Sequence, residues 1–322
     1  MASQKCNNPK CTFDTNGHCF ENADPIESCT NLKSVATEVK KKEKIASEES
    51  ESVLWSGNYF NPSDISKLSG HSNPQIIGLV GNAKAAKTSY LAMLYTLLLN
   101  GHFLNDLFFS NSYTLSAWEN LAFALRFNQG EVLFPEATPS NPDFYSIYHL
   151  GIKYNNSLKN VLFADASGEV FGQWAINVND TNASNVRWIH QNADGFIFFI
   201  DCEALINGRS EAKENILDIA NRLKENLKNR PVVMVWSKAD RISEVRTTIK
   251  QDLEEELKNQ FGDNATKFEV SNHTLNDPDP NCHINNLAVF EWLFKQINVP
   301  SNIHLELDIP LDSNDLFLNY RK

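Results

Sequence analysis

Residues 81–88, GNAKAAKT, have the spacing of a phosphate-binding loop. The pattern of such a loop is G-x-x-x-x-G-K-[ST], and Ala86 replaces its second glycine here. Lys87 is expected to reach the β- and γ-phosphates, and the Thr88 hydroxyl to bind Mg²⁺. A plain strand–turn–helix with a capping threonine would give the same letters. The residues expected to contact nucleotide in this segment are Gly81, Asn82, Ala83, Lys84, Ala85, Ala86, Lys87, Thr88 and Ser89.

The replaced glycine sets a conformational condition for this loop. A positive φ is costly for any residue with a Cβ atom. We therefore predict that Ala86 has a negative φ, with its Cβ turned away from the phosphates, and that the loop binds nucleotide.

A second motif ends the apolar run NVLFAD, where Asp165 and Gly168 form D-x-x-G. An acidic residue at the end of a neighbouring strand holds Mg²⁺ in P-loop nucleotidases, so we assign that role to Asp165. Gly168 would let a backbone N–H approach the γ-phosphate. An acidic turn at a strand end is also a common feature without any ligand.

Two further strand-end motifs predict a guanine pocket. Ser237, Lys238 and Asp240 follow the run VVMVW and match [NT]-K-x-D except at the first position. The Asp240 carboxylate can accept hydrogen bonds from both the ring N–H and the exocyclic amine of guanine, a donor pair that adenine lacks, and Lys238 would lie along the base. Ser271 and Asn272, after the run FEV, would meet the guanine oxygen. GTP and GDP are therefore expected rather than adenine nucleotides.

The elements that must position these motifs alternate between strand and helix. Short apolar runs without strict alternation are typical of strands buried on both faces, and helices between them predict an α/β fold with a mostly parallel sheet sandwiched by helices. Ligands of such sheets bind at the carboxyl ends of the strands, where all four motifs lie. Strands are expected at 76–80, 145–153, 161–164, 195–200, 232–236 and 268–270, and helices at 88–99, 115–127, 210–227, 244–260 and 287–296.

Residues 74–297 resemble the P-loop GTPases of the Ras-like, TRAFAC class, on the four motifs above. A narrower resemblance is to bacterial double-GTPase proteins of multi-gene conflict systems. It rests on SNSYTLSAWENLAFAL (110–125), FPEATP (134–139) and a short cysteine-rich leader before the GTPase domain. It implies a GTP-dependent switch or sensor in a defence assembly with protein partners. It also implies that Thr138 completes the Mg²⁺ coordination and senses the γ-phosphate. An exposed threonine before proline is the plain alternative.

The resemblance also bears on hydrolysis. Ras-like enzymes place a Gln after the D-x-x-G glycine to orient the attacking water, and Glu169 stands there in this chain. Its charge would face the γ-phosphate, so we expect slow hydrolysis that needs a partner, with Lys87, Glu169 and Thr138 as the catalytic group. Arg187 or Arg209 is a candidate internal arginine finger. The simpler interpretation is that both arginines form salt bridges at the surface.

Four of the six cysteines, Cys6, Cys11, Cys19 and Cys29, lie in the leader. Four thiolates suit tetrahedral Zn²⁺, with His18 as a possible substitute ligand, and some thirty residues cannot bury a core without such a crosslink. The alternative is a disordered leader with free thiols.

The rest of the composition limits the class of protein. The net charge of −11 disfavours nucleic acid as a partner. No apolar run approaches a membrane span and no signal peptide is expected, so we predict a cytoplasmic protein. The expected divisions are a zinc-binding leader (1–35), a charged linker (36–70), the GTPase domain (71–300) and a tail (301–322) that is either an extension or an extra strand packing back on the domain.

Two other functions remain open from sequence alone. A pseudo-GTPase scaffold without meaningful turnover is supported by four departures, namely Ala86, Ser237, Glu169 and the weak motif VSN at 270–272. A zinc-dependent nucleic-acid binder would need a basic face, which the net charge of −11 disfavours.

Overall fold

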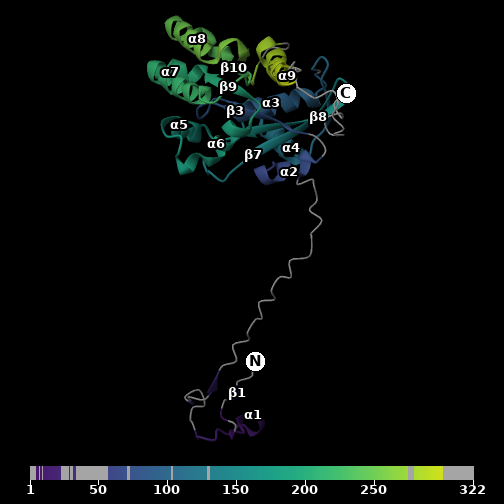
Figure 1. The fold of residues 1–322 in the computed structure, drawn as a ribbon, viewed down its shortest axis with the longest axis vertical. Helices are drawn as coiled ribbons and strands as arrows, with labels where there is room; N and C mark the ends of the chain where they lie inside the picture. The colour runs from purple at the N-terminus through teal and green to yellow at the C-terminus, as the bar shows by residue number, and fades with distance from the viewer. Residues whose placement is uncertain are drawn as a thin grey trace, which may run out of the picture. The chain divides into compact units, whose positions relative to one another are not determined.

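The computed structural model describes residues 5–6, 8, 10–22, 29, 32–33, 57–70, 73–102, 104–128, 131–274 and 279–299. The chain divides into two compact units, Met1–Val53 and Leu54–Lys322. In the first unit, strand β1 (Lys5–Cys6) pairs antiparallel with β2 (Leu32–Lys33), and helix α1 (Phe13–Asn16) lies between them in the sequence (Figure 1).

The second unit is built on a seven-stranded sheet in the order β11-β10-β9-β3-β8-β7-β4. Neighbouring strands from β11 to β8 are parallel, and only β7 and β4 pair antiparallel with their neighbours. The expected α/β fold with a mostly parallel sheet is therefore confirmed. The strands are β3 (Gln75–Val80), β4 (Phe108–Asn111), β7 (Ser146–Tyr154), β8 (Ser157–Asp165), β9 (Gly195–Asp201), β10 (Val232–Ser237) and β11 (Ala265–Val270).

Strand β7 runs antiparallel because the connection to β8 is too short for a crossover. Tyr154 pairs with Ser157, and the two residues between them, Asn155 and Asn156, have φ of 47° and 61°. Two central residues with positive φ are typical of the tight turn of a β-hairpin, and asparagine tolerates that conformation. The hairpin also sets Asp165, at the end of β8, opposite Ser146.

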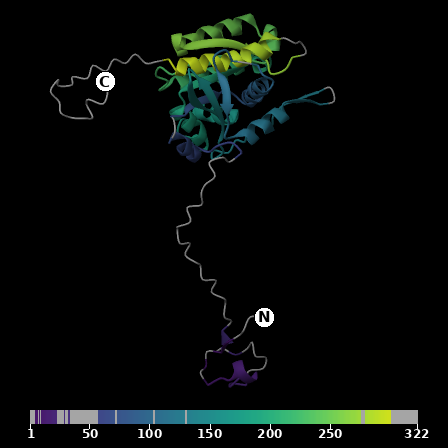
Figure 2. The ribbon, with the colours of Figure 1, turned by 90° about the vertical axis from the view of Figure 1, so that its right-hand side faces the viewer.

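Helices cover both faces of the sheet because alternate strand residues are apolar on each face (Figure 1). On β3, Ile77 and Leu79 belong to one core layer, and Ile76 and Val80 belong to the other. The first face carries α3 (Lys87–Leu99), α4 (Leu115–Ala124) and α9 (Asn285–Ile297), and Figure 2 shows α9, in yellow, running alongside the sheet. The second face carries α2 (Pro62–Ser69), α5 (Gly168–Ile176), α6 (Ser184–Asn192), α7 (Cys202–Lys224) and α8 (Thr247–Phe261).

The structure corrects several element boundaries. The helix expected over 115–127 ends at Ala124, because Arg126–Asn128 form β5, which pairs with β6 (Glu131–Leu133) in a hairpin. The helix expected from 210 begins at Cys202, where the Asp201 carboxylate caps it, and it kinks at Arg209 (φ 48°). The helices α2, α5 and α6 were not expected from the sequence. No helix in the described part of the chain is long and apolar enough to cross a membrane.

Candidate functional site

The loops after β3, β8, β9, β10 and β11 surround one cavity of ≈ 650 Å³. It unites the phosphate-loop residues 83–89 with 134–138, 140 and 167–169, and with the base-pocket residues Lys238, Asp240 and Asn272. The lining also includes Glu203, Arg241 and His273, which were not expected. Of the sequence-predicted residues, Gly81, Asn82, Asp165, Ser237 and Ser271 do not line the cavity themselves.

The phosphate loop leaves β3 through a residue that must be glycine. Gly81 has a φ of 154°, and a Cβ atom there would lie 3.0 Å from the Cβ and the carbonyl oxygen of Phe199. The loop then turns twice through positive φ, at Lys84 (61°) and Ala86 (64°). The chain reverses there and enters α3 at Lys87.

Our prediction for Ala86 is wrong, because its φ is 64° and its ψ is 23°. The Ala86 carbonyl accepts the first hydrogen bond of α3, which Tyr90 N–H donates over 2.9 Å. A residue in this position usually has an extended backbone, so the left-handed conformation comes from the turn of the loop, in which Lys84 also has a positive φ. The backbone path therefore requires this conformation whatever the side chain. For a residue with a Cβ atom the strain costs ~1–2 kcal/mol.

Lys87 arches back over the loop. Its Nζ donates to the carbonyl oxygens of Gly81 (3.0 Å) and Asn82 (3.1 Å), and the side chain is buried. Burial lowers the pKa of Lys87 to about 8, and the Asp165 carboxylate offsets part of this shift. An ammonium desolvated in this way gains much from a phosphate group, since the phosphate would replace the lost hydration.

Three residues predicted to bind metal meet at one point. Oδ2 of Asp165 accepts hydrogen bonds from Thr88 Oγ1 (2.7 Å) and Thr138 Oγ1 (3.0 Å), and the two hydroxyl oxygens are 3.1 Å apart. Oδ1 of Asp165 is buried and has no hydrogen-bond partner among the described residues. Burial raises the pKa of the Asp165 carboxyl, and the Lys87 ammonium opposes this rise. An orphaned carboxylate oxygen beside two hydroxyls fits the hard-oxygen preference of Mg²⁺.

The D-x-x-G segment packs directly on the phosphate loop. A Cβ atom at Gly168 would lie 2.1 Å from Ala83 N and from the carbonyl carbon of Asn82, so no other residue fits. The next residue, Glu169, accepts a 2.7 Å hydrogen bond from Ser140 Oγ, which lies 3.1 Å from Ser167 Oγ. Thr138 and Ser140 therefore hydrogen-bond to the two ends of the segment 165–169, at Asp165 and at Glu169. The sequence carries no signal that singles out Ser140.

At the base pocket, Asp240 and Ser271 are held together. Ser271 Oγ donates to Asp240 Oδ1 (3.2 Å) and accepts from Asp240 N–H (3.0 Å), while the Asn272 side-chain oxygen is buried without a partner among the described residues. Ser237 instead donates to the Ile200 carbonyl (3.3 Å) and is buried between strands.

Lys238 lines the cavity, and two carboxylates hold its ammonium. Its Nζ lies 2.9 Å from Asp201 Oδ2 and 2.7 Å from Glu203 Oε2. The Glu203 carboxylate also pairs with Arg241 at 3.3 Å. The acidic end of the run GFIFFIDCE, an aspartate closing a buried strand, is the signal that could have identified Asp201.

Neither candidate arginine finger reaches the cavity. Arg187 donates to the carbonyl oxygens of Val178 and Asp180, and Arg209 is exposed at the kink of α7. Arg241 is the one arginine among the described residues that line the cavity.

In the first unit, the structure brings two of the four predicted zinc ligands together. Sγ of Cys19 and Sγ of Cys29 are 3.8 Å apart, and Cys29 is buried. The Cys6 backbone pairs with Leu32 in the small sheet, but its side chain lies outside what the structure describes. No group of three His, Cys, Asp or Glu side chains suited to a metal ion occurs within the described ranges.

Comparison with known proteins agrees with the geometry. A family described as Double-GTPase 2 matches residues 75–293, which run from β3 into α9 and include all four strand-end motifs. No curated protein matches the sequence. Because the match covers well over half of the chain, this GTPase-like protein belongs to the Double-GTPase 2 family.

Proposed function

We propose that this protein is a GTP-binding switch that hydrolyses GTP slowly with Mg²⁺. The observation that carries the proposal is the meeting of Thr88, Thr138 and Asp165 beside a cavity that also contains Lys87 and Asp240 at its opposite ends. Residues far apart in the chain form a phosphate end and a base end of one site. Membership in the Double-GTPase 2 family supports guanine nucleotide as the ligand.

Asp240 selects guanine in this proposal. Ser271 orients its carboxylate, and hydrogen bonds to a charged acceptor are each worth ~1.5–3 kcal/mol. The Asn272 oxygen, buried without a partner, is a further acceptor at this end. Lys238 forms ion pairs with Asp201, at the end of β9, and with Glu203, in the first turn of α7, and so holds the two elements together.

Lys87 and the loop N–H groups bind the phosphates and neutralise their charge. Thr88, Asp165 and Thr138 are the residues that would hold Mg²⁺, which when bound supplies charge neutralisation at the β- and γ-phosphates. Glu169 stands where the attacking water must be oriented, and its negative charge repels the γ-phosphate. No arginine among the described residues reaches this end, so hydrolysis is slow without a partner.

The switch itself is the segment that contains Thr138 and Ser140. It has no regular secondary structure, and its hydroxyls contact Asp165, Ser167 and Glu169. A γ-phosphate would add a contact to this segment that GDP cannot make, so the two nucleotides would hold it differently.

A pseudo-GTPase scaffold is the second candidate. The strained Ala86 and the acidic Glu169 favour it, because both weaken a working hydrolase.

One experiment separates the two functions. The full chain is purified without added nucleotide, its bound nucleotide is identified, and phosphate release from GTP and ATP is followed with Mg²⁺. We expect bound GDP and slow turnover of GTP only. Lys87→Ala should abolish binding and turnover, whereas Lys258→Ala, an exposed position on α8, should change neither. Absence of any nucleotide affinity would establish the scaffold instead.

For the first unit we propose a zinc site formed by Cys6, Cys11, Cys19 and Cys29. Two thiolates on one tetrahedral Zn²⁺, with Zn–S distances of ~2.3 Å, have sulfurs ~3.8 Å apart. Sγ of Cys19 and Sγ of Cys29 have this separation, 3.8 Å, which is far longer than the ~2.05 Å of a disulfide. The full chain should contain one zinc ion, retained in Cys202→Ser and lost in Cys19→Ser; a zinc-free protein would refute the site.

We also propose the wider setting that the resemblance implies. It comprises a Ras-like, TRAFAC-class GTPase in the cytoplasm, working with protein partners in a bacterial defence assembly. The four strand-end motifs support the class, and the segments 110–125 and 134–139 support the defence setting. The net charge of −11 disfavours nucleic acid as the partner.

A further inference from the structure

Strand β4 forms one edge of the sheet and carries exposed aromatic side chains. Phe108 and Phe109 are 53% and 43% exposed. β4 pairs with β7 on one side, and no described residue pairs with it on the other. An apolar edge strand with free backbone N–H and C=O groups favours aggregation unless something covers it.

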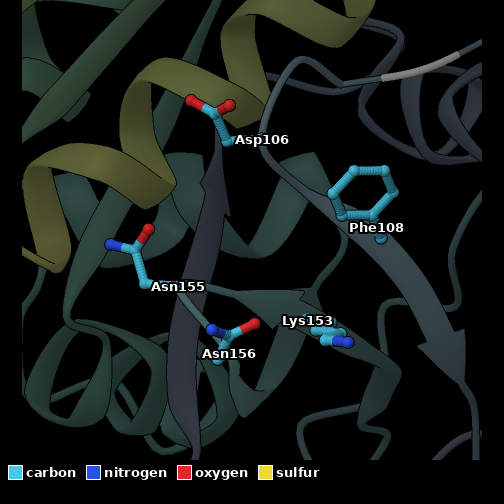
Figure 3. A pocket seen from close by; sticks show the side chains of 5 residues that line it. All are labelled: Asp106, Phe108, Lys153, Asn155 and Asn156. Carbon is cyan, nitrogen blue, oxygen red and sulfur yellow. The ribbon is translucent and has the colours of Figure 1, made fainter.

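The surface beside this edge is hollowed. A depression of ≈ 620 Å³ is lined by Phe108 on β4, by Lys153 on β7, by Asn155 and Asn156 at the hairpin turn, and by Asp106 (Figure 3). Lys153 pairs across the strands with Phe108 and forms no ion pair with any described residue. The depression therefore offers an apolar ring next to a lysine that forms no ion pair, with one carboxylate, Asp106, elsewhere in the lining.

The C-terminal segment of the chain has the sequence of an edge strand. In IHLELDI (303–309), Ile303, Leu305, Leu307 and Ile309 alternate with His304, Glu306 and Asp308. Strict alternation is typical of a strand with one buried face. Pro300 and Pro310 flank the segment. Proline and charged residues are common on the edge strands of sheets.

The last described helix, α9, ends near the start of β3, at the same end of the sheet as Phe108. Asn298, just after α9, exchanges hydrogen bonds with Gln75 at the start of β3, and the Phe294 ring contacts Tyr154 near the depression. A strand beyond β4 would lie four strand spacings from β3, or ~19 Å. The extended chain spans only ~17 Å from Asn298 to Ile303 but ~23 Å from Asn298 to Leu305, so Leu305 is the residue from which pairing can begin.

We propose that residues 305–309 pair with the free edge of β4 as an eighth strand. The chain arrives at the end of β4 where Phe108 lies, so the added strand runs parallel to β4. We place its apolar residues on the sheet face of Phe109, where they cover the Phe109 ring. On this face the β7 neighbour of Phe109, Ile152, is buried. Glu306 and Asp308 share the opposite face with Phe108 and Lys153, where either carboxylate can pair with the Lys153 ammonium.

Hydrogen exchange of the full chain tests this pairing. We expect slow exchange of the amides in 305–309 and in β4, and at least tenfold faster exchange of the β4 amides in a chain that ends at Val299. Unprotected amides in 305–309 of the full chain would overturn the proposal, as would unchanged β4 exchange after truncation.

Point variants keep the test independent of the truncation. Leu305→Asp with Leu307→Asp should accelerate β4 exchange as truncation does, whereas the same change of charge beyond the strand, Ser313→Asp with Asn314→Asp, should leave it slow. Protection of β4 that rises with protein concentration would mean that a second copy supplies the strand, which also overturns the proposal. GTP binding, measured on the same variants, should be unchanged because β4 contributes nothing to the nucleotide cavity.

Discussion

Thr138 Oγ1 donates a 3.0 Å hydrogen bond to Oδ2 of Asp165, the same oxygen that accepts the 2.7 Å hydrogen bond from Thr88. Asp165 is fixed by β8, whereas Thr138 lies in a segment without regular secondary structure. The position of that segment therefore depends on what the Asp165 carboxylate binds.

Replacing Thr138 with valine tests this dependence, because valine keeps the volume and removes the hydroxyl. We expect GTP affinity in the presence of Mg²⁺ to fall about tenfold, or ~1.4 kcal/mol, with GDP affinity nearly unchanged. Titration with each nucleotide, with Mg²⁺ and with a chelator, measures the effect. Thr181→Val, at an exposed position away from the cavity, is the control. An equal loss for GTP and GDP would contradict a γ-phosphate-sensing role.

Ala86→Gly should stabilise the protein, which is an unusual outcome for a glycine substitution. The left-handed φ of 64° costs alanine ~1 kcal/mol that glycine does not pay, although glycine gains entropy in the unfolded chain. Urea unfolding should show a net gain of up to ~1 kcal/mol. Ala122→Gly, inside α4, should instead lose ~1 kcal/mol, as expected for an ordinary helical alanine. A loss at Ala86 would mean that its methyl group contributes packing that outweighs the strain.

The order and placement of the motifs can be predicted from sequence because each follows an apolar run that must be a buried strand. Parallel strands bring their carboxyl ends to one edge, so Lys87 and Asp240 are predictable as opposite ends of one site. The proximity of Thr138 to Asp165 does not follow from spacing, since a hairpin and an irregular segment intervene; it came from family resemblance.

Other features depend on contacts that a linear pattern does not contain. Lys238 forms ion pairs because Asp201, at the end of the adjacent strand β9, lies within 2.9 Å of it. Ala86 has positive φ because the loop must turn into α3, a constraint of the backbone path that outweighs side-chain preference. Ser140 donates a hydrogen bond to Glu169 in the first turn of α5, from an irregular segment whose conformation no periodicity determines.

GTP affinity should fall at alkaline pH because of Lys87. Its pKa is about 8 in the folded protein without ligand, and phosphate charge favours the ammonium form, so above pH 8 binding must take up a proton. The dissociation constant should be flat from pH 7 to 8 and then rise up to tenfold per pH unit. In the absence of nucleotide, stability should show the opposite trend, rising between pH 8 and the ordinary pKa of 10.5, because only the unfolded chain then carries the charge. A dissociation constant that stays flat to pH 9.5 would mean that Lys87 keeps its proton there or makes no phosphate contact.

Glu169→Gln should accelerate GTP hydrolysis about tenfold, a gain of ~1.4 kcal/mol in the barrier. The amide removes the repulsion between the Glu169 carboxylate and the γ-phosphate, and it can still accept the hydrogen bond from Ser140. Its N–H₂ group can also donate to a phosphate oxygen while its oxygen orients water. Single-turnover phosphate release, with affinity measured separately, distinguishes a faster chemical step from tighter binding. Glu136→Gln removes a second carboxylate from the lining of the same cavity, so it shows how much of any change is general electrostatics. Hydrolysis that slows in Glu169→Gln but not in Glu136→Gln would contradict this prediction and make Glu169 the base that orients the water through its charge. The slow turnover would then have to arise because no arginine among the described residues lies at the phosphate end.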